Sequence, residues 1–306
     1  MTDLISIVTD PATFATVLRV MTPLLVAALG ILISDRAGVF NLGMEGMMLT
    51  GALAGVLVSA WTGSAWLGLL AAIIAGGLIG ALMAVAVNGL GANLIITGIA
   101  VNLAASSGTT LALFFATGDK GMSGALKSGV MPSLDLPFIE DIPGIGPLVS
   151  GHNVLTYAAL LAVPLVSIMM ARTPFGLRIR AVGVDPKAAA TVGISVKLIQ
   201  LQALILSGML GGMAGAYLSM GYVSWFAQDM TAGRGFIAIA IEVMGMATAW
   251  GTLAATVVIA IAETAAITMQ TFGLPNELMQ MIPYVVPIII LTVWTARGRA
   301  KRAAHR

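Results

Sequence analysis

The chain has 306 residues, of which 58% are hydrophobic and only 9% charged, with a net charge of +2 and a mean hydropathy of +1.00. A soluble domain carries about a quarter charged residues, so this composition excludes an ordinary water-soluble fold and indicates an integral membrane protein. The chain has no cysteine and only two histidines, His152 and His305. Disulfides and thiolate metal ligands are therefore excluded, and we expect no metal site.

Nine apolar stretches follow one another along the chain. They cover residues 13–33, 42–61, 65–89, 92–117, 153–171, 198–222, 236–249, 252–271 and 281–296. Their lengths predict an all-α polytopic helix bundle of about nine spans (eight to ten) in a single transmembrane domain covering residues 1–306. The stretches 236–249 and 281–296 are shorter than the ~20 residues of a full crossing, so we expect some helices to be short, broken or re-entrant.

The placement of lysine and arginine predicts which connections face the cytoplasm. Five basic residues lie in segment 172–197 and five more in the tail 297–306, so both should be cytoplasmic. The loop 118–152 has two lysines against four acidic residues and should be extracytoplasmic. With nine spans, this puts the N-terminus outside and the C-terminus in the cytoplasm.

The basic segment 172–197 contains a compact predicted helix. Its aspartate can cap the first turn, its proline suits the first helical position, and its glycine can take the left-handed conformation that ends a helix. The residues of this expected helix are Asp185, Pro186, Lys187, Ala188, Ala189 and Gly193. Such a small, smooth element has the shape of a part that docks into another protein. A solvated loop that contains a short helix is the alternative.

Three glutamates, Glu45, Glu242 and Glu263, lie inside apolar runs. A carboxylate in the hydrocarbon core is costly, so each should face a partner, a cavity or an interface. Asn41 lies four residues before Glu45, so on a helix the two share a face and could line a translocation path. Alternatively, Asn41 caps a helix whose first turn carries Glu45 at the favourable end of the helix dipole.

The apolar span 92–117 contains two groups of polar side chains that point in different directions. The members are Asn93 and Thr97 in the first group and Asn102, Ser106 and Thr109 in the second. The second group lies about 120–180° around the helix from the first, so one straight helix cannot point both at one cavity. Either one group bonds to neighbouring helices or the helix breaks near Gly98. We expect interhelical bonds for one group and a place on the path for Asn102.

Asp229 and Arg234 precede the short stretch 236–249 and should lie outside. They indicate a re-entrant turn or a docking site for an external partner, with a solvated loop and a weak local ion pair as the alternative. No phosphate-binding G-x-x-x-x-G-K-[ST] loop, Ser/His/Asp set or HExxH motif occurs. We therefore expect no enzyme activity, no bound cofactor and no nucleic-acid partner, and energy must come from a partner or an ion gradient.

Four segments, in this order, carry a family resemblance: SDRAGVFNLGMEGMMLTGA (34–52), NLIITGIAVNL (93–103), FGLRIRAVGVDPKAAATVGISV (175–196) and AGRGFIAIAI (232–241). Together they resemble the permeases of bacterial ABC importers for nucleosides and simple sugars, within the group that also contains the ribose and branched-chain amino-acid permeases. The chain departs from this pattern at Leu94, where relatives often carry Glu or Gln, and at Glu242, where they usually have an apolar residue.

The resemblance implies a permease subunit in the bacterial cytoplasmic membrane, surrounded by lipid and paired with a different homologous permease. A cytoplasmic ABC ATPase would bind the 185–193 helix and hydrolyse ATP. An extracytoplasmic binding protein or lipoprotein would deliver the substrate. A path lined by Asn and Thr suits nucleosides or related small polar solutes, with simple sugars or branched-chain amino acids as alternatives. A proton-driven secondary transporter that uses the buried glutamates, or a purely structural membrane subunit, remains open on the residues alone.

Overall fold

The computed structural model describes residues 11–124, 126–135, 150–270, 281, 284–290 and 292. Its elements are α2 (Pro11–Arg36), α3 (Met44–Thr62), α4 (Ala65–Ala84), the π-helix η1 (Val85–Gly89), α5 (Leu94–Thr117), β1 (Ser133–Leu134), β2 (His152–Asn153), α7 (Val154–Arg172), α8 (Pro174–Val184), α9 (Pro186–Thr191), α10 (Val196–Met220), α11 (Arg234–Met244) and α12 (Ala249–Gln270). Within these residues, seven helices are long and apolar enough to cross a membrane. The prediction of an all-α polytopic membrane protein is confirmed.

Seven of the nine predicted spans correspond to these long helices. The stretch 236–249 contains only the short helix α11, as its length predicted, and most of 281–296 lies outside the described residues. The predicted loop 118–152 adds a short antiparallel pair, β1 with β2, in which Leu134 lies opposite His152.

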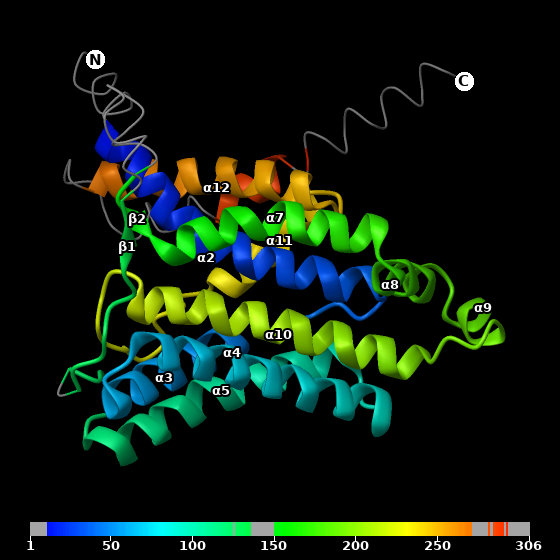
Figure 1. Cartoon of the computed structure of the whole chain (residues 1–306), viewed down its shortest axis with the longest axis horizontal. Helices are drawn as coiled ribbons and strands as arrows, with labels where there is room; N and C mark the ends of the chain where they lie inside the picture. Colours follow the sequence, from blue (N-terminus) through cyan, green and yellow to red (C-terminus); the bar gives the residue numbers. More distant parts are fainter. Residues whose placement is uncertain are drawn as a thin grey trace.

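The helices lie side by side along the longest axis of the molecule (Figure 1). At one end lie α8, α9 and the beginning of α10, and we call this the α8–α9 end. At the other lie β1, β2 and the beginning of α7, and we call this the β1–β2 end. α5 and α12 form opposite edges of the bundle in this view.

α10 lies at the centre, packed against α2, α3 and α4. Glycine allows the close approach: a Cβ on Gly51 would lie 2.5 Å from the Cα of Gly212, and one on Gly212 would strike the backbone of Ala72. Gly208 and Gly212, four residues apart on α10, therefore serve helix packing, which in a membrane depends on close contact of backbones. Fully buried leucines of α2 and methionines of α3 fill the remaining core, among them Leu24, Leu29, Met44, Met47 and Met48.

α11 is a half-helix that crosses part of the bundle. Its 11 residues span about 16 Å, roughly half of a ~30 Å hydrocarbon core. It begins in the interior beside α3 and ends at Gly245, after which Met246 and Ala247 adopt positive φ. Arg36, the last residue of α2, donates from Nε to the carbonyl oxygen of Ala247 at 2.7 Å. The chain therefore turns at the α8–α9 end before α12 begins, which confirms the expectation of a broken helix.

Candidate functional site

The half-helix α11 is held at its N-terminus by a carboxylate from α3. Glu45 accepts hydrogen bonds from the backbone N–H groups of Gly233, at 2.7 Å, and Gly235, at 2.6 Å. The first N–H groups of a helix have no partner within the helix and carry partial positive charge, so an anionic acceptor satisfies both needs. A Cβ on Gly235 would lie 2.5 Å from the backbone nitrogen of Glu45, which explains the glycine there. Glu45, in the first turn of α3, thus connects the N-terminus of α3 to the N-terminus of α11 inside the bundle.

Asn41 supports the same junction from the linker before α3. Its side chain is fully buried, and its amide nitrogen donates to the Ser207 hydroxyl of α10 at 2.8 Å. Its oxygen accepts from the backbone N–H of Gly43 at 3.0 Å, just before α3 begins. Asn41 therefore provides an acceptor for a backbone N–H at the start of α3. This resembles the alternative in the sequence analysis, in which Asn41 caps the helix that carries Glu45.

Asn102 provides the interhelical hydrogen bonds of α5. Its amide nitrogen donates to the carbonyl oxygen of Leu42 at 2.8 Å, and its oxygen accepts from the N–H of Gly46 at 2.9 Å. α5 runs without interruption through Gly98, so the alternative of a helix break there is wrong. A Cβ on Gly98 would lie 2.6 Å from the Cβ of Leu42, so this glycine permits close packing on the linker.

Asn93 and Thr97 lie apart from the Glu45 junction, in the first turn of α5. Asn93 is the N-cap and accepts from the backbone N–H groups of Ile95 and Ile96 at 2.9 and 3.2 Å. The Thr97 hydroxyl donates to the carbonyl oxygen of Asn93 at 2.8 Å. The structure therefore does not bring all five candidate path residues together: Asn41, Glu45 and Asn102 meet at the interior junction, and the other two lie in the first turn of α5.

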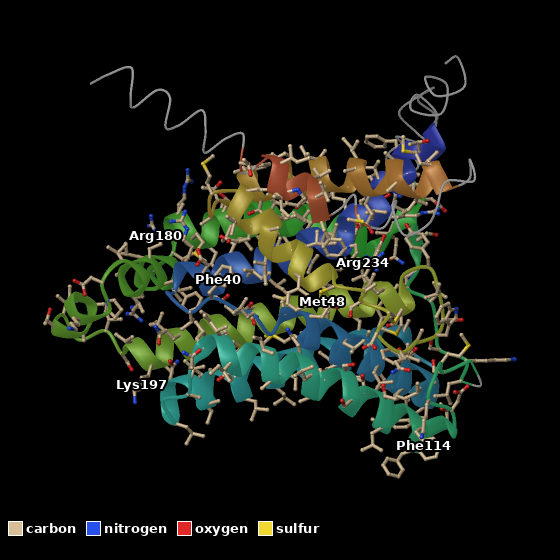
Figure 2. The ribbon with its side chains drawn as sticks, turned by 180° about the vertical axis from the view of Figure 1, so that it is seen from behind. Phe40, Met48, Phe114, Arg180, Lys197 and Arg234 are labelled. Carbon is tan, nitrogen blue, oxygen red and sulfur yellow. The ribbon has the colours of Figure 1, made fainter. Side chains whose placement is uncertain are left out.

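Asp229 and Arg234 do not pair with each other. Arg234 lies between the two ends of the bundle, as Figure 2 shows, and its guanidinium contacts the carboxylate of Glu263 in α12 at 3.2 Å. Asp229 accepts from the Ser106 hydroxyl of α5 at 2.8 Å. The segment before α11 is thus tied to both edge helices of the bundle, and the re-entrant turn fits this arrangement better than a solvated loop.

A cavity of about 350 Å³ lies along the exposed side of α5 beside Asp229. We call it the α5 cavity; it is lined by Ser106, Ser107, Thr110, Leu111, Phe114, Lys120 and Gln228. Ser106 lies halfway along α5, so the cavity reaches from mid-depth toward the β1–β2 end, where Figure 2 labels Phe114. The sequence analysis did not identify Phe114, Lys120 or Gln228, although the polar spacing of Ser106 and Thr110 was a usable signal.

Glu242 is isolated from these groups. It is buried in α11, with 2% of its surface exposed, and its Oε1 has no hydrogen-bond partner among the described residues. It occupies the position where the resemblance leads to an apolar residue. Its charged neighbours are Asp35 and Arg36 at the end of α2, and the positive charge of Arg36 favours a carboxylate here.

The α8–α9 end contains two short helices where the sequence analysis expected one. α9 has the predicted ends: Asp185 accepts from the N–H groups of Lys187 and Ala188 at 2.9 and 3.1 Å, and Gly193 has a φ of +83°. α8 was missed, although the Thr173 hydroxyl caps it by accepting from Gly176 and a proline follows. The two helices project beyond the ends of the long helices (Figure 1), which suits a docking element.

Comparisons with known proteins agree with this architecture. TsgC13 of Haloferax volcanii, named as a glucose ABC transporter permease protein, is 36% identical over 72% of this chain and 67% of its own length. NupQ of Bacillus subtilis, a guanosine ABC transporter permease protein, is 33% identical over 92% of this chain and 91% of its own.

An ABC transporter described as of metal-chelate type, solved in an inward-facing conformation, shares the fold. The TM-score is 0.51 and the sequence identity 16%, over 92% of this chain and 85% of that chain. Residues 13–291 match the family described as branched-chain amino acid transport system / permease component. This match covers nearly the whole chain, and the chain belongs to that permease family.

Proposed function

We propose that the chain is the transmembrane permease subunit of an ATP-driven ABC importer for nucleosides or related small polar solutes. The observation that carries the proposal is the α5 cavity, with Asp229 at its edge. Hydroxyl groups of Ser106 and Thr110, the amide of Gln228 and the carboxylate of Asp229 can exchange hydrogen bonds with a ribose and a base. The Phe114 ring offers an apolar face on which a base can stack, and the Lys120 ammonium already lies 5.3 Å from its centre.

The position of the cavity supports a path between two permease subunits. α5 is the least buried of the seven long helices and lies at an edge of the bundle. Exposed polar and charged groups at membrane depth are costly against lipid, so a second, homologous permease subunit covers this face in the assembled transporter. In this arrangement the substrate is enclosed between the subunits, and we favour a heterodimer.

The α8–α9 end faces the cytoplasm in this proposal. Its five exposed cations, Arg172, Arg178, Arg180, Lys187 and Lys197, follow the charge rule for cytoplasmic loops. In this proposal α9 is the docking element for an ABC ATPase that hydrolyses ATP. The β1–β2 end then faces outward and receives an extracytoplasmic binding protein or lipoprotein. The chain lies in the cytoplasmic membrane of a bacterium. The predicted outer N-terminus and basic tail 297–306 lie outside the described residues.

Simple sugars are the second candidate substrates. They are favoured by the similarity to TsgC13, which is named as a glucose permease. The hydroxyl, amide and carboxylate groups at the α5 cavity would also form hydrogen bonds with a pyranose. The two candidates differ at the aromatic ring, because only a nucleoside presents a flat base for Phe114.

The proposal is tested by uptake into proteoliposomes that contain the complete transporter purified through a tag on this chain. A co-purifying ATPase, and ATP-dependent accumulation of guanosine or adenosine, are the expected results. Accumulation of glucose but not of nucleosides would move the assignment to sugars. Uptake driven by a proton gradient without ATP, by the chain alone, would overturn the importer.

A substrate role of the α5 cavity predicts that Phe114→Leu raises the KM for nucleosides. Loss of base stacking costs about 1–3 kcal/mol, or roughly 5- to 150-fold. Phe115→Leu, at an exposed ring of the same helix outside the cavity, is the matched control. Equal KM values in the Phe114→Leu and Phe115→Leu variants would show that the α5 cavity does not bind the substrate.

A further inference from the structure

A second polar cavity, separate from the α5 cavity, lies at the α8–α9 end. Its volume is about 190 Å³, and it is formed where the ends of α2 and α7 meet α8 and the turn between α11 and α12. Its polar lining consists of Arg36, Arg180, Ser167 and Thr248. Val166 and Met170 of α7 are among the apolar residues of its wall. The pocket therefore combines two arginine side chains with an apolar wall from α7.

The charged side chains that line this pocket are both arginines, and no acidic side chain lines it among the described residues. The nearest carboxylates, Asp35 and Glu242, interact with Arg36 without lining it. Arg180 forms no hydrogen bond or ion pair with the described residues, and Figure 2 shows it at the α8–α9 end, on α8. Arg36 donates from Nε and one Nη to the carbonyl of Ala247, which leaves further N–H donors of its five unused. The pocket thus offers several unpaired donors to an anion.

The position of the pocket limits the kind of anion. It lies at the ends of α2 and α7, two helices that are long and apolar enough to cross a membrane, so in a bilayer it would lie near the head-group region. A ligand that fills it carries an anionic group for the arginines and an apolar part for α7. Arginine binds phosphate through parallel N–H···O bonds, and basic pockets between helices suit lipid head groups.

We propose that this pocket binds the phosphate of an anionic membrane phospholipid, whose first apolar carbons contact Val166 and Met170 and whose acyl chain leaves the pocket into the bilayer. The bound phosphate bridges α8, through Arg180, to the turn after α11, which Arg36 holds by Ala247. Anionic lipid thereby connects the segment that carries α9 to the half-helix of the interior.

Native mass spectrometry of the purified transporter, released from nanodiscs, measures the lipids that it retains. Phosphatidylglycerol and phosphatidylcholine are supplied together as the anionic and zwitterionic probes. The wild type should retain phosphatidylglycerol preferentially. Arg180→Gln should weaken this retention about fivefold, the equivalent of ~1 kcal/mol for one basic residue near the head groups. Arg178→Gln, an exposed arginine on the same helix that does not line the pocket, is the matched control.

Arg180 is the informative position because it has no partner to lose, whereas Arg36→Gln also releases the Ala247 turn. Equal retention in the Arg180→Gln and Arg178→Gln variants would overturn the proposal. Inorganic phosphate distinguishes the two sources of the anion: if phosphate alone displaces phosphatidylglycerol completely, the pocket is a site for a soluble anion and the lipid assignment is wrong. Persistence of the lipid in excess phosphate supports it, because the acyl chain contributes to binding.

Discussion

Replacing Glu45 by alanine should destabilise the protein, because its carboxylate holds the N-terminus of α11. The carboxylate accepts from Gly233 and Gly235 at 2.7 and 2.6 Å, the only acceptor bonds that the structure shows for those two N–H groups. Without it, both donors at the start of α11 remain unsatisfied inside the bundle. We expect this to loosen the half-helix first, because its N-terminus has no side-chain cap of its own.

The magnitude follows from these two bonds. A hydrogen bond to a charged group contributes about 1.5–3 kcal/mol, so two contribute about 3–6 kcal/mol before water enters the vacated space. Glu45 is half-buried rather than fully buried, and partial hydration of the freed donors reduces the expected loss to about 2–4 kcal/mol. Glu45→Gln keeps an acceptor without the charge and should lose about half as much.

The assay is equilibrium unfolding in mixed micelles of a mild detergent and SDS, with α-helix content as the signal. Asp119→Ala is the matched control, because Asp119 also accepts from a backbone N–H, that of Gly121 at 2.8 Å, but in an exposed loop. It should change the free energy of unfolding by less than about 1 kcal/mol. If the Glu45 and Asp119 variants lose the same small amount, the carboxylate does not hold α11 and the reasoning is refuted.

Three further changes probe packing, docking and the α5 junction. Gly212→Leu should lower the free energy of unfolding by about 3 kcal/mol, because the new side chain strikes the α4 backbone. Gly108→Ala, in open space within α5, should raise it by about 0.5–1 kcal/mol, because alanine is the better helix former, and the same titration measures both. Ala188→Glu should abolish stimulation of the partner ATPase at unchanged stability, while Ala189→Glu, at a position only 4% exposed, should also unfold α9; ATPase assays and circular dichroism separate the two. Asn102→Leu should cost about 1–3 kcal/mol, because one backbone N–H and one carbonyl lose their partner, and unchanged unfolding would contradict this.

Local chemistry made several features predictable from the sequence. Membrane spans follow from the length of apolar stretches, since nothing else shields a helix backbone in lipid. The ends of α9 follow from Asp185 and Gly193, whose preferences act within a few residues. Glycines four residues apart, as in α10, are typical of helices that pack closely in lipid, although such spacing does not identify the partner helix.

The tertiary structure decided how the polar groups are paired. Glu45 and Gly233 are 188 residues apart, and Ser106 and Asp229 are 123 apart, so only the packing of the helices brings them together. The alternative of a local ion pair between Asp229 and Arg234 does not form, because the position of α12 brings Glu263 to Arg234. The sequence by itself determined that this chain is a membrane protein with many apolar helices and where the short helix α9 begins, because propensity, capping and hydropathy are local. Which carboxylate meets which helix end, and where the cavities lie, depended on the assembled bundle, because a buried charge takes the nearest donor in space rather than in sequence.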